Sequence, residues 1–248
     1  GGQANTNSTL GSSNFDGSIQ TTVKVNASSG FSIVTYTGTG ADGTIGHGLG
    51  VAPNVAFTKK RSGTQNWLVK HSGVSSGKVG YLDLSDPFDN SGSGGGIISD
   101  FSSSSNYSIT RYNNSGGYGN VNESSATYVS YVFSEVAGFS KFGSYTGNGS
   151  DNGTFVFLGF RPAWVLIKNI SSSSRDWIIK DAKIDTFNLM EKAFKANTAD
   201  AEFASLSGVD FLSNGFKARN NGTQINGSSI TYIYFAFAES PFKNARAR

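Results

Sequence analysis

The sequence predicts an all-β protein with two tandem antiparallel β-sandwich domains of the jelly-roll or lectin-like kind, formed by internal duplication and preceded by an extended N-terminal arm. Three observations predict this class: abundant turn-forming residues, short aromatic and β-branched runs, and an internal repeat. Gly, Ser, Thr and Asn make up 110 of the 248 residues, charged residues make up 15%, and Cys is absent. This composition excludes disulfide-stapled modules and long helical proteins. The 13% of aromatic residues argues against general disorder.

The chain contains one pattern twice. The run GFSIVTYTGTG from Gly30 recurs as GFSKFGSYTGNG from Gly138, and a Trp-x-x-Lys motif begins at Trp67 and again at Trp177. Both copies close with an aromatic run that ends in Glu. The matched landmarks keep one order at offsets of 104 to 110 residues, so we expect a duplicated domain of about that size.

The repeat sets the domain boundaries. Residues 1–29 hold few large apolar side chains and are predicted to form an N-terminal arm or linker. Residues 30–137 are predicted to form the first β-sandwich repeat, and residues 138–248 the second, which includes a basic C-terminal tail. Each copy is long enough to bury a core of its own.

Strands are predicted where short apolar runs lie between turn residues. Along each copy they are a weakly alternating run at 31–36, apolar runs at 54–59 and 163–168, Trp runs at 67–70 and 177–180, and closing runs at 128–135 and 232–239. In the first closing run alternate residues share a face, whereas the second is apolar on both faces, as expected of a central strand. Gly and Asn between the runs supply the positive φ of tight turns.

The stretch Asp185–Ala204 has two interpretations. Phe187, Met190 and Phe194 lie roughly on one face of a possible amphipathic helix. The matching stretch of the first copy, 79–85, resembles a strand, and the repeat therefore favours strand and loop. Both alternatives remain open from the sequence.

No catalytic or metal-binding pattern stands out. The two histidines, His47 and His71, both lie in the first copy. A histidine-based zinc site or a Ser-His-Asp triad therefore cannot be a shared feature of the repeat. Glu135 and Glu239 occupy equivalent places in separate copies and would not face each other across one sugar. The acidic spacing around Asp86 does not match a calcium-binding EF-hand loop. We therefore expect a protein that is not an enzyme and has no cofactor and no metal.

Charge and hydropathy limit the partners. The net charge is +3 and the basic residues are scattered, which does not indicate nucleic-acid binding. No apolar run reaches the roughly 18 residues of a membrane-spanning helix, so membrane insertion is not expected either.

Five aromatic residues are candidates for ligand contact. Tyr112 and Tyr118 lie in a Gly- and Asn-rich loop of the first copy, and Trp164 has no aromatic counterpart in the other copy. Trp67 and Trp177 occupy equivalent strands, where a core position is the alternative to stacking on a sugar ring.

Several of the repeated motifs resemble a family of bacteriophage virion proteins. The motifs are GFSIVTYTG at 30–38, HGLGVAP at 47–53, WLVKH at 67–71 and YIYFAFAESPFK at 232–243. They are similar to tandem β-sandwich repeats found in the tail fibres of marine and cyanobacterial phages, and the resemblance covers about 30–248. In the second copy FLGFR replaces the His-containing form, so His47 is not a requirement of the repeat.

The resemblance implies a virion location and a structural or adhesive role, and it carries no catalytic motif. We expect the distal part of a tail fibre that adheres to host-surface glycans and assembles as a homo-oligomer, a homotrimer by analogy. The arm 1–29 would join it to other virion proteins. The first alternative is a capsid decoration or head-fibre protein that is anchored by this arm. A tailspike-type glycan hydrolase is a further alternative.

Overall fold

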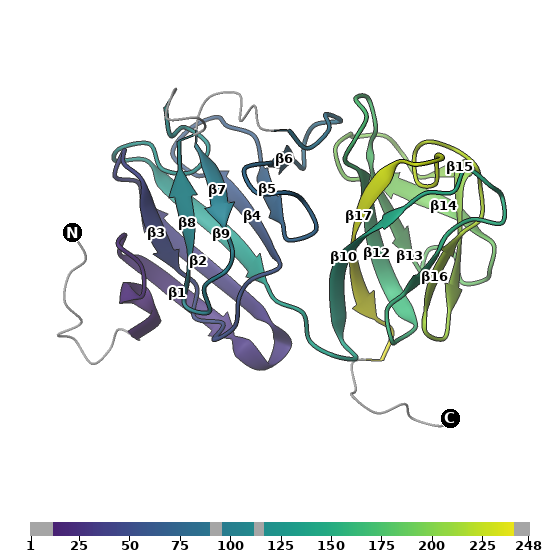
Figure 1. Cartoon of the computed structure of the whole chain (residues 1–248), viewed down its shortest axis with the longest axis horizontal. Helices are drawn as coiled ribbons and strands as arrows, with labels where there is room; N and C mark the ends of the chain where they lie inside the picture. Colours follow the sequence, from purple (N-terminus) through teal and green to yellow (C-terminus); the bar gives the residue numbers. More distant parts are fainter. Residues whose placement is uncertain (1–11, 90–95, 112–116, 241–248) are drawn as a thin grey trace. The chain divides into compact units, whose positions relative to one another are not determined.

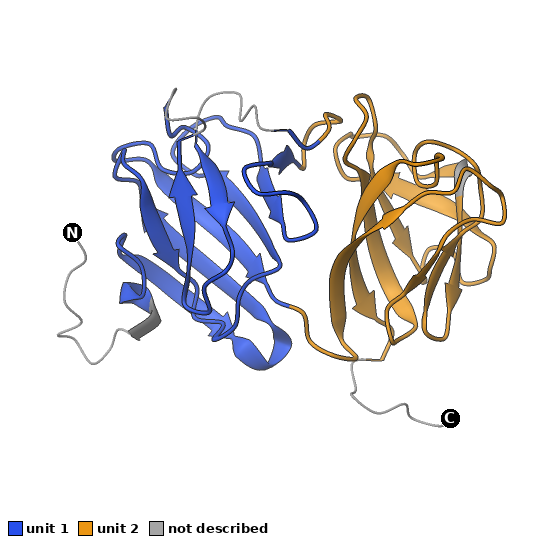
Figure 2. Ribbon diagram, viewed as in Figure 1, with its two compact units in different colours: residues 1–81, 88–134 blue, residues 82–87, 135–248 orange. Residues whose placement is uncertain are grey.

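The structure is a computed structural model that describes residues 12–89, 96–111 and 117–240. Within these ranges the chain is all-β, which confirms the predicted fold class, and the helical turns are two short 3-10 segments, η1 (Ser12–Phe15) and η2 (Ala27–Ser29). No helix in the described ranges has the length and apolar character that crossing a membrane requires. The chain divides into two compact units, residues 1–81 with 88–134 and residues 82–87 with 135–248, called unit 1 and unit 2 below (Figure 2).

Unit 1 is a sandwich of two antiparallel sheets (Figure 1). The larger sheet has the order β1 (Thr21–Asn26), β2 (Phe31–Thr37), β9 (Thr127–Phe133), β4 (Val55–Lys60), β5 (Leu68–His71) and β6 (Gly80–Tyr81). The smaller sheet has the order β3 (Gly43–Gly46), β8 (Asn106–Thr110) and β7 (Ile97–Asp100).

Unit 2 is one eight-stranded antiparallel sheet that nearly closes on itself. Its order is β10 (Ser140–Thr146), β17 (Thr231–Ala238), β12 (Pro162–Asn169), β13 (Trp177–Asp181), β14 (Met190–Lys195), β15 (Phe203–Leu212), β16 (Gly215–Ala218) and β11 (Phe155–Phe157). The two end strands approach each other, because the Lys141 Nζ of β10 lies 5.4 Å from the ring centre of Phe157 on β11.

The internal duplication is visible in the strand order. The order β2-β9-β4-β5 in unit 1 matches β10-β17-β12-β13 in unit 2, and β3-β8-β7 matches β11-β16-β15. The main difference is β14, which has six residues where β6 has two and pairs with strands on both sides. It therefore joins the two halves of unit 2 into one sheet, whereas unit 1 keeps two.

The alternation predicted for the closing strands agrees with their burial. In β9, Tyr128, Ser130 and Val132 are buried, whereas the residues between them are only partly covered. The Tyr107 hydroxyl of β8 donates to Ser130 Oγ at 2.9 Å, which supplies a partner for a polar group inside the sandwich. In β17 the residues from Tyr232 to Ala236 are buried on both faces, as predicted for a central strand.

A buried asparagine organises the same turn in each unit. Asn226 Nδ2 donates to Asn148 Oδ1, Ser150 O and Asn220 O at 2.9, 2.8 and 2.7 Å, while Asn226 Oδ1 accepts from the backbone N–H groups of Asn148 and Thr154. In unit 1 Asn122 holds the turn after β2 in the same way, because its Oδ1 accepts from Thr39 N at 2.9 Å.

Paired tyrosines support each of these turns. Tyr36 stacks on Tyr128 at 5.2 Å and donates to the Val121 carbonyl at 2.6 Å. Tyr145 stacks on Tyr232 at 5.0 Å and donates to the Ile225 carbonyl at 2.6 Å. The same stacked tyrosine pair, with one hydroxyl bonded to a loop carbonyl, therefore recurs at the corresponding end of the sheet in each unit.

Part of the predicted N-terminal arm is folded into unit 1. Residues 21–26 form β1, which pairs with β2 along its whole length, and the Val23 N–H donates to Asn14 Oδ1 at 2.8 Å. The alternating β-branched residues of this stretch favour a strand, although none is large enough to signal a core position. Residues 1–11 of the arm lie outside the described residues, as do 241–248 of the basic tail.

The open question about Asp185–Ala204 is settled in favour of strand and loop. The chain forms turns up to residue 189 and then β14, so strand pairing with β13 and β15 replaces the local helical pattern. Leu82–Pro87 belongs to unit 2, where the Ser85 carbonyl accepts hydrogen bonds from Lys168 Nζ and Arg175 N, each at 3.1 Å. The repeat does not predict this placement.

Candidate functional site

A polar hollow of about 410 Å³ lies in unit 1, where β1 begins and β2 ends. Most of its lining residues carry hydroxyl groups, and we call it the hydroxyl hollow. The hydroxyl residues on its solvent-accessible side are Ser18, Thr22, Thr35, Thr37, Thr39 and Thr127. Gln20 and Arg61 complete the polar lining.

Strand register brings these hydroxyl groups together. Thr22 of β1 lies opposite Thr35 of β2, and Thr37 of β2 lies opposite Thr127 of β9. Opposite residues of antiparallel strands have their Cβ atoms about 5 Å apart on one face. The floor of the hollow is thus two threonine pairs on one face of the larger sheet.

The segment that precedes β1 forms a fixed wall of the hollow. Ser18 and Thr44 exchange hydrogen bonds between backbone N–H and side-chain oxygen at 2.8 and 2.9 Å, and the Ile19 N–H donates to the Thr44 carbonyl at 3.1 Å. Gly17 lies so close to β3 that a Cβ there would fall 2.3 Å from the Thr44 carbonyl oxygen. Only glycine allows this approach, which holds the wall in place.

Arg61 stands at the rim of the hydroxyl hollow. Its backbone N–H donates to the Thr127 carbonyl at 2.7 Å, and Thr127 N–H donates to Ser62 Oγ at 3.0 Å, so the backbone on both sides is held. The neighbouring Lys60 forms an ion pair with Glu123. Among the described residues Arg61 has no carboxylate partner, and no acidic residue lines the hollow.

The hollow presents many groups that can form hydrogen bonds. Hydroxyl, amide and guanidinium groups donate and accept hydrogen bonds, which suits a small polyhydroxylated ligand. Within the part of the chain that the structure describes, its lining contains neither a histidine nor a carboxylate. A second, smaller hollow of about 210 Å³ contains Lys70 and Asp100, but Lys70 Nζ donates to two backbone carbonyls and Asp100 accepts from Ser102.

Tyr118, one of the two predicted tyrosines, does not line the hydroxyl hollow. Tyr118 is half-buried, its hydroxyl donates to Asp42 Oδ1 at 2.6 Å, and the Arg111 guanidinium lies 5.8 Å from its ring centre. Burial, and then the Asp42 carboxylate, raise the pKa of Tyr118. The phenol is therefore already hydrogen-bonded to the segment between β2 and β3. Tyr112 lies outside the described residues, so its predicted role stays a prediction.

The three tryptophans occupy different environments, and none of them lines the hydroxyl hollow. Trp177 is fully buried and packs on Phe235 at 6.0 Å, which fits the core alternative and leaves no ring face for a sugar. Trp67 is half-buried and stacks on Tyr131 at 6.2 Å. Trp164 is half-buried and packs on Phe237 at 5.9 Å. Ligand contact at Trp67 and Trp164 stays a prediction.

Buried lysines are held by backbone carbonyls. Lys180 Nζ donates to the carbonyls of Met190, Glu191 and Lys192 at 3.2, 3.0 and 3.0 Å, so each ammonium proton has an acceptor. Burial lowers the pKa of Lys180 to about 8, and burial lowers the pKa of Lys168 likewise to about 8. Burial also lowers the pKa of His47. In the described ranges no set of three His, Cys or acidic residues is placed to hold a metal ion.

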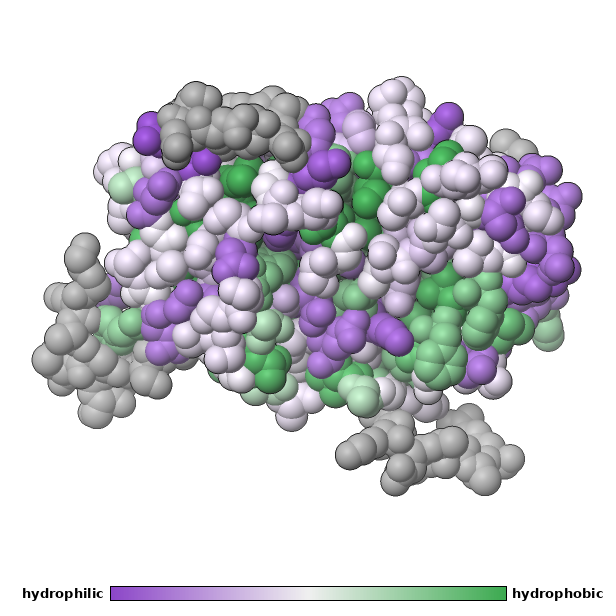
Figure 3. All heavy atoms as spheres, viewed as in Figure 1, coloured by the Kyte–Doolittle hydropathy of each residue, from purple (hydrophilic) through white to green (hydrophobic). Residues whose placement is uncertain are grey.

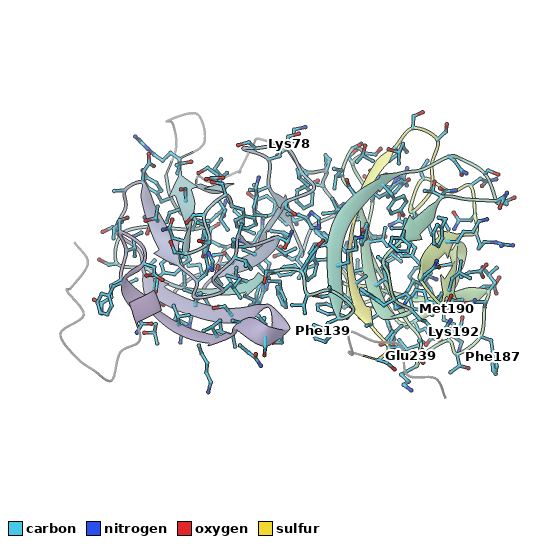
Figure 4. The ribbon with its side chains drawn as sticks, turned by 60° about the horizontal axis from the view of Figure 1, so that its bottom comes forward. Lys78, Phe139, Phe187, Met190, Lys192 and Glu239 are labelled. Carbon is cyan, nitrogen blue, oxygen red and sulfur yellow. The ribbon has the colours of Figure 1, made fainter. Side chains whose placement is uncertain are left out.

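Unit 2 carries exposed apolar side chains. Figure 3 shows hydrophobic side chains over its lower part in that view, and its exposed large apolar residues are Phe155, Phe157, Phe187 and Leu189. Phe187 is 80% exposed and points away from the rest of the unit (Figure 4).

The hydroxyl hollow was not predicted from the sequence. Threonine is common in strands, so Thr35, Thr37 and Thr39 at alternate positions indicate a strand before they indicate a site. The available signal was the β-branched run at 21–25, which indicates a further strand and places Thr22 opposite Thr35 once it pairs with β2. The hollow forms because the pairing register of β1, β2 and β9 places these threonines side by side, and the sequence alone does not show this register.

Residues 4–241 match a protein family described as "Domain of unknown function (DUF7483)". The chain belongs to this family. The single match spans both units, so the duplicated pair as a whole corresponds to the family domain. No curated protein and no solved structure matches the chain.

Proposed function

We propose that the protein is a structural component of a bacteriophage virion, the distal part of a tail fibre that adheres to host-surface glycans. The resemblance of its repeated motifs to tail-fibre repeats motivates the virion assignment. The hydroxyl hollow is the observation that carries the adhesive role, because its threonine pairs and Arg61 offer hydrogen bonds to a saccharide.

Multivalency makes a shallow site of this kind useful. An open hollow of about 410 Å³ without an enclosing apolar wall favours weak binding of one sugar unit. A homotrimer would present three hollows, and linked sites raise the overall avidity by about 10²–10⁴ over one site. We propose such a homo-oligomer, joined to other virion proteins through the N-terminal segment.

A matched pair of double variants tests the adhesive role. Thr37→Val with Thr127→Val removes two hydroxyl groups from the hollow at nearly constant volume. Thr146→Val with Thr231→Val makes the same change at the equivalent register pair of unit 2, outside the hollow. The first variant should lose binding of the assembled oligomer to host cells and host polysaccharide, and the second should keep it. Equal binding by both variants would contradict a site in the hollow.

The two alternatives from the sequence are separated by other outcomes. A structure of the whole particle that places the chain on the capsid shell, together with no binding to host polysaccharide, would replace adhesion with decoration. Shortening of host polysaccharide chains during incubation with the protein would establish a hydrolase.

A further inference from the structure

We propose that the hydroxyl hollow selects acidic saccharides, with Arg61 as the group that binds the carboxylate of a uronic acid or similar sugar. This inference rests on the proposed function, because it names the ligand class of the same site. The observations that carry it are the charge of the lining, the position of Arg61 and the anchoring of its backbone.

The charge of the lining is one-sided. Arg61 is its one charged residue among the described residues, and the other lining groups are hydroxyls, an amide, an isoleucine and the buried Tyr36. Glu123, the partner of the neighbouring Lys60, does not line the hollow. A positive group without a counter-charge beside neutral hydrogen-bonding groups complements an anion that also carries hydroxyls.

The position of Arg61 matches a ligand that spans the threonine pairs. Arg61 follows the last residue of β4 and lies beside Thr127, which in turn lies opposite Thr37. A sugar ring over Thr37 and Thr127 would bring a ring carboxylate within reach of the guanidinium. The planar guanidinium fork can bind both oxygens of a carboxylate, which a lysine ammonium cannot do with the same geometry.

The anchored backbone gives the interaction a defined geometry. The hydrogen bonds of Arg61 N to Thr127 O and of Thr127 N to Ser62 Oγ fix the Cα of Arg61 relative to the threonines. The Arg61 side chain is exposed, so screening by salt limits the binding free energy that its charge contributes. We therefore expect the charged sugar to bind about ten-fold more tightly than the neutral one. This ratio corresponds to a difference of about 1.4 kcal/mol in binding free energy.

The test compares one oligosaccharide in charged and neutral forms. The probes are an oligo-uronate of defined length, its carboxyl-reduced neutral counterpart and a sulfated neutral oligosaccharide, titrated by calorimetry into the full-length assembled protein. The variants are Arg61→Gln, Arg61→Lys and the control Lys78→Gln, which changes a lysine in the loop between β5 and β6 at the other edge of the sheet (Figure 4). Thermal unfolding of each variant shows that it is folded.

The expected result is about ten-fold tighter binding of the oligo-uronate than of its neutral counterpart by the wild type, weaker at higher salt. Arg61→Gln should bind both forms equally, Arg61→Lys should keep part of the preference, and Lys78→Gln should keep all of it. Equal binding of both forms by the wild type would overturn the acidic selectivity and leave glycan adhesion intact.

Three other outcomes would also overturn the inference. Tight binding of the sulfated probe alone would replace the carboxylate with a sulfate as the recognised group. Failure to bind any probe, while host polysaccharide is still bound, would remove this ligand class. Failure with host polysaccharide as well would remove the adhesive function itself.

Discussion

The side chain of Asn226 should be among the most stabilising polar groups of unit 2. It is fully buried, and it connects three acceptors and two backbone N–H groups from the turn after β10 and the loop before β17. Asn226→Ala leaves the carbonyls of Ser150 and Asn220 and the N–H of Asn148 without this partner. Each buried orphan group costs about 1–3 kcal/mol, and water can relieve part of this near the exposed turn.

We therefore expect Asn226→Ala to lower the free energy of unfolding by about 3 kcal/mol. For a unit of roughly 100 residues this corresponds to a fall in Tm of about 10–20 °C. The measurement is urea denaturation followed by circular dichroism, with calorimetry for Tm. Asn221→Ala is the matched control, because Asn221 is exposed, and such a change usually alters stability by less than about 0.5 kcal/mol.

Asn122, the equivalent asparagine of unit 1, provides a second test of this prediction. Asn122 is also fully buried and holds Thr39 and Ala41 through its side chain, so Asn122→Ala should cost a similar amount. A loss below about 1 kcal/mol for either asparagine, or a loss as large for Asn221→Ala, would refute the reasoning that these side chains hold the repeated turns.

Three further predictions concern backbone approach and pH. Gly38→Ala should lower the free energy of unfolding by about 2 kcal/mol or more, since the new Cβ would fall 2.1 Å from the Glu123 carbonyl oxygen. Gly50→Ala meets no atom within 4 Å and should cost about 1 kcal/mol from its positive φ alone. Equal losses of stability for the two variants in urea denaturation would contradict this. His47 has a pKa near 6.5 in the unfolded chain, and burial lowers its pKa in the folded protein. The unfolded chain therefore binds more protons, and stability should fall as the pH drops from 7 through 6.5. His47→Gln should reduce this dependence of stability on pH. Lys180 has a folded pKa of about 8 against 10.5 when unfolded, so between these values the unfolded chain holds the extra proton and stability rises with pH, by up to about 3 kcal/mol. A Lys180→Met variant with an unchanged slope over pH 8–10 would show that another group causes the rise.

The fold class and the duplication followed from local pattern. The alternating run at 128–135 and the run at 232–239 that is apolar on both faces predicted the closing strands. The burial of β9 and β17 agrees with these patterns. The strand at 21–26 was missed because its stability comes from pairing with β2 and from Asn14, not from large apolar residues of its own. At 190–195 pairing on both sides overrides a helical pattern that the sequence alone left open.

The candidate site was harder to predict than the fold. Aromatic residues attract attention as sugar-binding groups, yet Trp177 is fully buried and the Tyr118 phenol is hydrogen-bonded to Asp42. The hydroxyl hollow is assembled from residues of four separate segments, and none of them is unusual for a β protein. Only the register that sets Thr127 between Thr37 on one side and Arg61 on the other shows that they form one surface.

A crystal structure of the assembled protein with a saturating acidic oligosaccharide tests the central claim most directly. The account predicts an ordered sugar in the hydroxyl hollow, over Thr37 and Thr127, with its carboxylate on the Arg61 guanidinium. A sugar bound at another surface, such as that around Trp164 or Tyr118, would contradict it, as would an empty hollow at saturation.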